Sequence, residues 1–145
     1  MVDHHGDADA LAQDCARAMY AEDQASRALG IEITGVSPGR AAARMTVTAA
    51  MVNGHAIAHG GYVFLLADTA FAFACNTYGQ VTVAREADIS FVAPAREGDV
   101  LVATAVERHR RGRNGIYDVT VARDGGEVVA EFRGHSRELG TPLLG

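Results

Sequence analysis

The chain has 145 residues, of which 48% are hydrophobic and 21% charged, and its formal net charge is -5. This length and composition suit one folded domain and exclude a disordered or fibrous chain. The net negative charge argues against nucleic acid as the main partner, because phosphate binding requires a basic face. All 13 basic residues are arginine, which we attribute to compositional bias.

The cysteine content and the apolar runs indicate a compartment. Cys15 and Cys75 are too few for a disulfide framework and lack zinc-site spacing. The first residues do not show the basic and apolar regions of a secretory signal. The longest apolar run, residues 62–75, is shorter than the roughly 20 residues of a membrane span, and Asp68 interrupts it. We therefore expect a cytoplasmic protein with no membrane partner.

The first third of the chain is predicted to hold two helical segments and a β-hairpin. Apolar periodicity favours the helices, and Gly30 marks a break after them. The turn signal Pro38-Gly39 separates the two strands. The predicted ranges are 7–20 and 22–29 for the helices, and 31–36 and 40–47 for the strands.

A long apolar segment follows a loop predicted over residues 51–58, where Asn53-Gly54 is a turn signal. Residues 60–77 are mostly Ala, Leu, Phe and Val, and this run is too long for a typical strand. Its length and composition predict a buried helix with packing partners on most sides.

Four strands are predicted after this helix, over residues 81–92, 99–110, 115–123 and 127–138. Glycine-rich turns at 112–115 and 124–126 are typical of hairpins. Hydrophobic residues lie on both faces of strand 99–110, so we expect both faces to be covered. Two strands, a buried helix and four strands predict an antiparallel sheet wrapped around a central helix, in one α+β domain over residues 1–145.

Asp68 is the only charged side chain between Gly60 and Tyr78. A buried carboxylate without a partner is costly, so such a residue is either hydrogen-bonded for structural reasons or retained for chemistry. The residue alone leaves both interpretations open.

The motif His59-Gly60-Gly61 stands at the predicted start of the same helix. Helix N-termini carry unpaired N–H groups and a partial positive charge, and glycine lets a carbonyl approach them closely. These are the properties of an oxyanion hole. The alternative is that the glycines only form a turn. Asn53 could contribute to the same opening, or could only form its Asn-Gly turn.

The spacing of Gly60 and Asp68 restricts how they could act together. Eight residues of helix correspond to about 12 Å along the axis, whereas reacting atoms must approach to about 3–3.5 Å. If both groups serve one reaction, Asp68 must therefore come from a second subunit. Two helices running antiparallel across a twofold axis would produce two equal sites, and the monomer should be inactive.

Other chemistries fit less well. His55 and His59 lie on either side of the loop–helix boundary and have no evident third metal ligand, so we expect no metal site. Neither a G-x-S-x-G motif nor a P-loop is present. Arginines cluster near one predicted hairpin, where they either form a solvated loop or clamp the phosphates of a substrate. They are Arg108, Arg110, Arg111 and Arg113.

Three motifs together closely resemble the hotdog-fold acyl-CoA thioesterases, and most closely their phenylacetate-pathway (PaaI-type) branch. They are Asn53-Gly54-His55, His59-Gly60-Gly61 and Ala67-Asp68-Thr69-Ala70. The resemblance extends to residues 19–21, 29–31, 115–119 and 132–136, so it covers most of the chain.

The resemblance implies a hotdog fold, dimers that pair into a homotetramer, and hydrolysis of phenylacetyl-CoA or hydroxyphenylacetyl-CoA. CoA is part of the substrate, and no further cofactor is implied. Asp68 would act as general base or nucleophile, and the Gly60 amide would polarise the thioester carbonyl. Asn53 and His59 would orient the thioester and the attacking water. The candidate substrate-binding residues are Gly61, Thr69, Arg111 and Arg113.

One feature departs from the pattern of this family, and two other functions remain open. Some relatives carry a Ser or Thr near the start of the next strand, where this chain has Val83-Ala84-Arg85-Glu86. A hotdog dehydratase or hydratase acting on acyl-CoA or acyl-ACP would depend on a catalytic histidine. A non-catalytic acyl-CoA-binding protein would bind the ester without releasing thiol, and would leave Asp68 unexplained.

Overall fold

The computed structural model describes residues 4–145. Two helices precede the sheet and one long helix crosses it. The helices are α1 (His4–Glu22), α2 (Gln24–Ala28) and α3 (Gly60–Cys75), with a short 3-10 turn at Ala49–Met51. The strands are β1 (Glu32–Ser37), β2 (Arg40–Thr46), β3 (Gln80–Phe91), β4 (Val100–Arg111), β5 (Asn114–Arg123) and β6 (Val128–Pro142).

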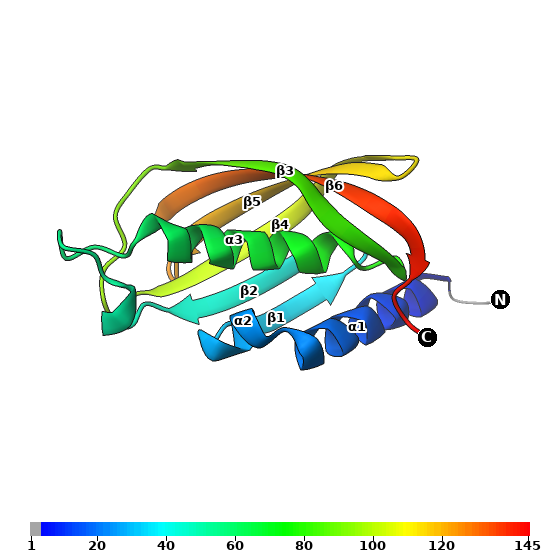
Figure 1. Ribbon diagram of the computed structural model, residues 1–145, viewed down its shortest axis with the longest axis horizontal. Coiled ribbons are helices and arrows are strands. Elements are labelled where there is room, and N and C mark those ends of the chain that lie inside the picture. Colours follow the sequence, from blue (N-terminus) through cyan, green and yellow to red (C-terminus); the bar gives the residue numbers. More distant parts are fainter. Residues whose placement is uncertain (1–3) are drawn as a thin grey trace.

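The strands form one sheet in the order β1-β2-β4-β5-β6-β3, and every neighbouring pair is antiparallel. α3 lies along one face of the curved sheet, while α1 and α2 lie beside β1 at one edge (Figure 1). β3 forms the other edge. This arrangement confirms the predicted α+β architecture of a sheet around a central helix.

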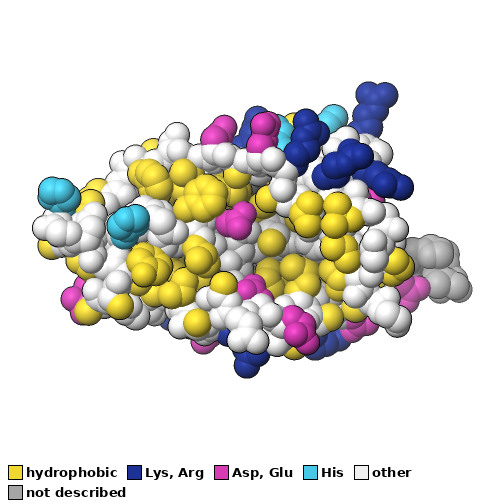
Figure 2. Space-filling model, in the orientation of Figure 1, with side chains coloured by type: hydrophobic (Ala, Val, Ile, Leu, Met, Phe, Trp, Pro, Cys, Tyr) yellow, Lys and Arg dark blue, Asp and Glu magenta, His cyan; other side chains and the backbone are white. Residues whose placement is uncertain are grey.

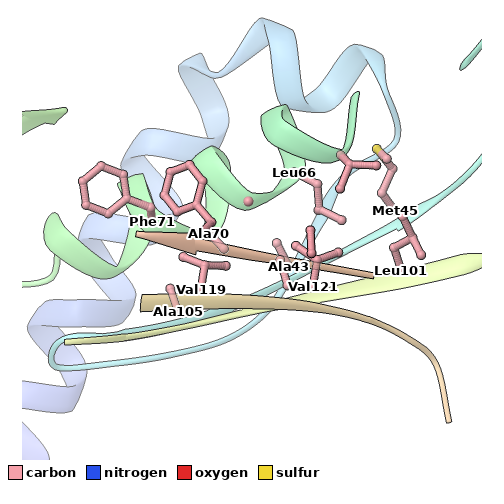
Figure 3. Close-up of a cluster of buried hydrophobic side chains, with 14 of the residues drawn as sticks. Ala43, Met45, Leu66, Ala70, Phe71, Leu101, Ala105, Val119 and Val121 are labelled. Atoms are coloured by element: carbon pink, nitrogen blue, oxygen red, sulfur yellow. The ribbon is translucent and has the colours of Figure 1, made fainter. Parts of the chain in front are cut away.

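The core lies between α3 and the sheet. Side chains on the inner side of α3, such as Leu66 and Phe71, point toward apolar side chains of the strands (Figure 3). Leu101, Ala103 and Ala105 alternate along β4 and are fully buried, because successive strand residues point to opposite faces. The single buried row on β4 therefore faces α3.

The outer face of β4 corrects one prediction. Thr104 is exposed, and Val102 and Val106 are only half-buried. The expectation that both faces would be covered is therefore wrong for the protomer, because no second layer packs on the outer side of the sheet within the described chain.

The end of α3 is fixed by two polar side chains. Asn76 donates to the Ala72 carbonyl at 2.9 Å, and its own side-chain oxygen accepts from the Thr82 N–H at 2.8 Å. The Thr77 hydroxyl donates to the Ala74 carbonyl at 2.9 Å. These bonds satisfy the last carbonyls of the helix and end it two residues before the predicted boundary.

The strand boundaries lie within one or two residues of prediction except at the end of β6, which runs to Pro142 rather than to residue 138. The reason is long-range pairing, since Gln80 of β3 pairs with Pro142. Within residues 4–145, no helix is both long and apolar enough to cross a membrane.

Candidate active site

One face of α3 is not covered by the sheet. Gly61, Leu65, Asp68 and Ala72 recur at helical spacing, and they are exposed or half-buried, whereas nine residues on the rest of the helix are buried. Figure 2 shows this side of the molecule, where hydrophobic side chains gather over α3 and the strands beside it. The predicted helix therefore has packing partners on most sides, but Asp68 lies on the side without one.

The Asp68 carboxyl group is half-buried and unpaired. Within the part of the chain that the structure describes, it makes no hydrogen bond or ion pair. Burial raises its pKa above the ordinary value for an aspartate. The structural interpretation of Asp68 required a hydrogen-bond partner, and the protomer provides none among these residues.

The first turn of α3 leaves the Gly60 donor unused. His59 is the N-cap, and its Nδ1 accepts from the Gly61 N–H at 2.9 Å. The Tyr62 N–H donates to the His59 carbonyl at 3.0 Å. No acceptor among residues 4–145 takes the Gly60 N–H. The structure thus presents the free Gly60 amide at the positive end of the helix.

The loop before α3 holds this end of the helix in place. The Asn53 side-chain oxygen accepts from the His55 N–H at 2.9 Å and from the Ile57 N–H at 3.4 Å. The Ala58 N–H donates to the Ala95 carbonyl at 2.7 Å. Asn53 therefore has the turn-forming role, which was one of its two predicted roles. Its side-chain NH₂ group donates no hydrogen bond within the described chain.

Thr69 and Gly61 have contacts of their own within the protomer. The Thr69 hydroxyl is buried and lies 2.9 Å from the Ser26 hydroxyl, which ties α3 to α2. A side chain at Gly61 would begin 3.1 Å from the ring nitrogen of His59. Both residues were predicted to bind substrate. In the protomer, Thr69 instead joins α3 to α2, and Gly61 lies against the His59 ring.

The predicted arginines lie at the turn between β4 and β5. Arg111 and Arg113 are exposed, and neither forms an ion pair within residues 4–145. The other two members of the cluster, Arg108 and Arg110, pair with acidic side chains. Arg111 borders a pocket of about 200 Å³ on the outer side of the sheet.

A further arginine, Arg85, lines this pocket, and Arg137 is linked to it through Asn114. The Asn114 side-chain oxygen accepts from Arg85 and from Arg137, at 3.3 Å in each case. These arginines come from β3 and β6, so their sequence positions gave no sign that they would join Arg111. Strand register alone brings them together.

The free Gly60 amide and the arginines lie at opposite ends of the protomer. Arg111 pairs with Asn114, Asn114 with Arg137, and Arg137 with Val83 of β3. Gly60 instead contacts Phe91, at the other end of β3. The eight residues from 83 to 91 correspond to about 26 Å of strand.

Phe91 is a neighbour of Gly60 that sequence reasoning missed. A side chain at Gly60 would begin 2.9 Å from the tip of the Phe91 ring, and Phe91 is 56% exposed. The only sequence signal was an aromatic residue at the end of a predicted strand, which does not indicate proximity to a helix that begins 31 residues earlier. By contrast, Phe71 and Phe73 of α3 belong to the core.

A further cavity lies away from α3. About 830 Å³ in volume, it is bordered by α1, Arg27 and β1, and no residue of α3 lines it. His55 and His59 are exposed, and the described residues contain no group of three or more potential ligands placed to hold a metal ion.

Comparison with known proteins identifies the family. The sequence profile of the Thioesterase superfamily matches residues 55–130. Acyl-coenzyme A thioesterase PaaI of Escherichia coli strain K12 is 46% identical over 130 residues, which are 90% of this chain and 93% of the relative. A putative esterase of Deinococcus radiodurans is 43% identical over 122 residues, 82% of each chain.

Comparison with solved structures supports the same family. The structure of the E. coli PaaI protein from the phenylacetic acid degradation operon matches with a TM-score of 0.91 and 45% identity, over 92% of this chain and 97% of that chain. A mutant of the phenylacetic acid degradation protein PaaI from Thermus thermophilus matches with a TM-score of 0.77 and 36% identity, over 81% of this chain and 100% of that chain. The chain belongs to the Thioesterase superfamily and has the hotdog fold, as the sequence resemblance predicted.

Proposed function

We propose that this protein is an acyl-CoA thioesterase that hydrolyses phenylacetyl-CoA or hydroxyphenylacetyl-CoA to the free acid and CoA. The observation that carries the proposal is the pair of unpaired groups on α3, the half-buried Asp68 carboxyl and the free Gly60 amide. The names of the relatives support the reaction and the acyl class, since one is an acyl-CoA thioesterase and another a phenylacetic acid degradation protein.

The site is formed by two subunits. Within one helix Gly60 and Asp68 are about 12 Å apart, which is too far for one reaction centre. If two α3 helices pack antiparallel across a twofold axis, Asp68 comes to lie beside Gly60 of the partner subunit. The uncovered stripe of α3 and the unpaired edge of β3 are the surfaces that such a partner would cover. Two dimers then form the homotetramer.

The geometry suggests the following reaction. The Gly60 N–H donates to the thioester carbonyl oxygen and stabilises the negative charge that develops there. Asp68 takes a proton from water as the water oxygen bonds to the carbonyl carbon, and the carbon–sulfur bond then breaks and the proton passes to sulfur. The raised pKa of Asp68 suits a group that accepts and returns a proton. Direct attack by the carboxylate, followed by hydrolysis of an anhydride, requires the same positions of Asp68 and the Gly60 N–H around the thioester carbonyl.

The neighbouring groups position the reactants. Because Nδ1 of His59 accepts from Gly61, a neutral ring carries its proton on Nε2, and this N–H with the Asn53 NH₂ group orients the thioester and the water. Gly61 leaves the approach to the amide open. Thr69, bonded to Ser26, fixes the turn of α3 that carries Asp68.

The arginines are proposed to bind the phosphates of CoA. In an antiparallel dimer, Gly60 of the partner subunit lies about 12 Å nearer to Arg111 than the protomer's own Gly60 does. Measured along the strand direction, the separation between the carbonyl site and the arginines then falls from about 26 Å to about 14 Å. Arg111 and Arg113, with Arg85 and Arg137 beside them, are the groups suited to bidentate phosphate binding.

CoA is part of the substrate, and the proposed reaction needs no further cofactor. Cys15 and Cys75 are free and buried, which suits the reducing cytoplasm in which we place the reaction.

The test is release of CoA thiol from phenylacetyl-CoA, followed with a colorimetric thiol reagent. The wild-type protein should release thiol, and Asp68→Asn should reduce kcat by about 10²–10⁴-fold because the general base is lost. Asp124→Asn is the matched control, since Asp124 is an exposed acid in the turn between β5 and β6 and should keep the wild-type rate. Wild-type activity in Asp68→Asn would show that the assignment is wrong.

Two outcomes would identify the rival functions. Saturable binding of the ester by the wild-type protein without thiol release would indicate a binding protein. Hydration or dehydration of an acyl-CoA, abolished by His59→Ala and retained by Asp68→Ala, would indicate a dehydratase or hydratase.

A further inference from the structure

The end of β3 places an exposed aromatic ring beside the free amide. Phe91 is the last residue of β3, on an edge of the sheet. It is 56% exposed, and only Val92, at 58%, exceeds it among the large hydrophobic residues of the described chain. A large exposed apolar side chain indicates a surface that another molecule covers.

The contact between Phe91 and α3 is close and directional. A side-chain carbon at Gly60 would lie 2.9 Å from Cζ of the ring and 3.3 and 3.4 Å from its two Cε atoms. The ring therefore directs its outer edge at the α-carbon of Gly60. The absence of a side chain at Gly60 creates the space that the ring uses.

The same α-carbon carries the amide that remains free. A carbonyl oxygen bound by this N–H lies about 2.9 Å from the nitrogen, and the acyl substituent is bonded to the adjacent carbon. A substituent that points from this carbon toward the Cβ side of Gly60 meets the Phe91 ring. Aromatic groups prefer edge-to-face or offset contacts with ring centroids about 4.5–7 Å apart.

We propose that Phe91 is a specificity-determining residue whose ring forms the wall of the acyl pocket beside the Gly60 amide and favours aromatic over straight-chain acyl groups. This inference rests on the proposed thioesterase function. The occupant of the exposed ring surface is the aryl group of the substrate, because the free hydrogen-bond donor of the first turn of α3 lies at the same place.

The experiment compares kcat/KM for phenylacetyl-CoA and hexanoyl-CoA in the wild-type protein and in Phe91→Leu, Phe91→Tyr and Leu139→Ala. Phe91→Leu keeps apolar volume but removes the ring, so the phenylacetyl-to-hexanoyl ratio should fall about three- to tenfold. Phe91→Tyr restores a ring and should restore the ratio. Leu139 is 50% exposed on β6, and its variant should keep the wild-type ratio.

The outcomes separate this inference from the function on which it rests. Failure of the wild-type protein to hydrolyse either ester would refute the proposed function. A wild-type enzyme whose ratio stays within about twofold in Phe91→Leu would overturn the role of Phe91. Equal loss for both esters, with or without dissociation of the assembly on a sizing column, would also overturn it, because Phe91 would then serve assembly or folding alone.

Discussion

The two sides of α3 differ in what they contribute. The inner side carries Leu66, Ala70 and Phe71, all at most 1% exposed and packed on the strands (Figure 3). The outer side carries Leu65 and Asp68, which the sheet does not cover. The inner side supplies the burial that stabilises the fold, whereas the outer side keeps an unpaired acid at a cost. Under the proposed function, one side of α3 stabilises the fold and the other side carries the catalytic acid.

After the loss predicted for Asp68→Asn, the largest effect is expected at the free amide. Gly60→Pro removes the N–H, and Pro is tolerated at the first position of a helix. His59 has ψ of 133°, which suits the residue before a proline. The kcat for phenylacetyl-CoA should fall about 10²–10³-fold, as measured by thiol release.

Gly60→Ala is the matched control for that substitution. It adds the same β-carbon against the Phe91 ring but keeps the N–H, so it should retain much more activity. Equal losses in the two variants would show that crowding at Phe91, and not the amide, causes the defect.

A pair of leucines on opposite sides of α3 tests the separation of roles. Leu66→Ala creates a cavity in the core and should lower the free energy of unfolding by about 2–5 kcal/mol in urea titrations. Leu65→Ala, at a half-buried position, should cost less in unfolding and should instead promote dissociation on dilution, measured by light scattering. The reverse pattern would contradict the division between the two sides.

A smaller effect is expected at the arginines. Arg111→Ala should raise KM for phenylacetyl-CoA by about tenfold, with kcat unchanged, because a phosphate contact is lost. The loss should shrink as salt is added, since exposed charges are screened. Arg44→Ala removes an exposed arginine of β2 and should leave KM as in the wild type; equal KM values in the two variants would exclude Arg111 from phosphate binding.

The smallest effect concerns stability and pH. Because burial raises the pKa of Asp68, the folded state holds its proton at a pH where the unfolded chain has lost it. The stability linked to this group is therefore present at low pH and is lost as pH rises through the raised pKa. Asp68→Asn should melt slightly above the wild type at pH 7, and the difference should disappear in acid. A lower Tm at pH 7 would indicate a hidden partner for the carboxylate.

Local patterns predicted much of this molecule from its sequence. The apolar run at 60–77 predicted α3, and a single acid within it drew attention to Asp68, because composition and spacing act within one element. Phe91 beside Gly60, and Arg85 with Arg137 beside Arg111, could not be predicted. These contacts depend on the register of strands far apart in the chain, which no local pattern specifies.

The uncovered side of α3 was also beyond local patterns. An almost wholly apolar helix is expected to be buried on all sides. The sequence does not show which side is buried by the same chain and which by a second chain. The eight-residue spacing of Gly60 and Asp68 was the one sequence feature that pointed to a partner.

Mixed assemblies test the shared site most directly. Asp68→Asn and Gly60→Pro proteins, each inactive alone, are unfolded together, refolded as a mixture and assayed for thiol release. If each site combines Asp68 of one subunit with Gly60 of the partner subunit, mixed dimers contain one intact site, and activity should return to about a quarter of the wild-type value. If the mixture shows no more activity than the two variants refolded separately, the two groups do not act across a dimer and the account is contradicted.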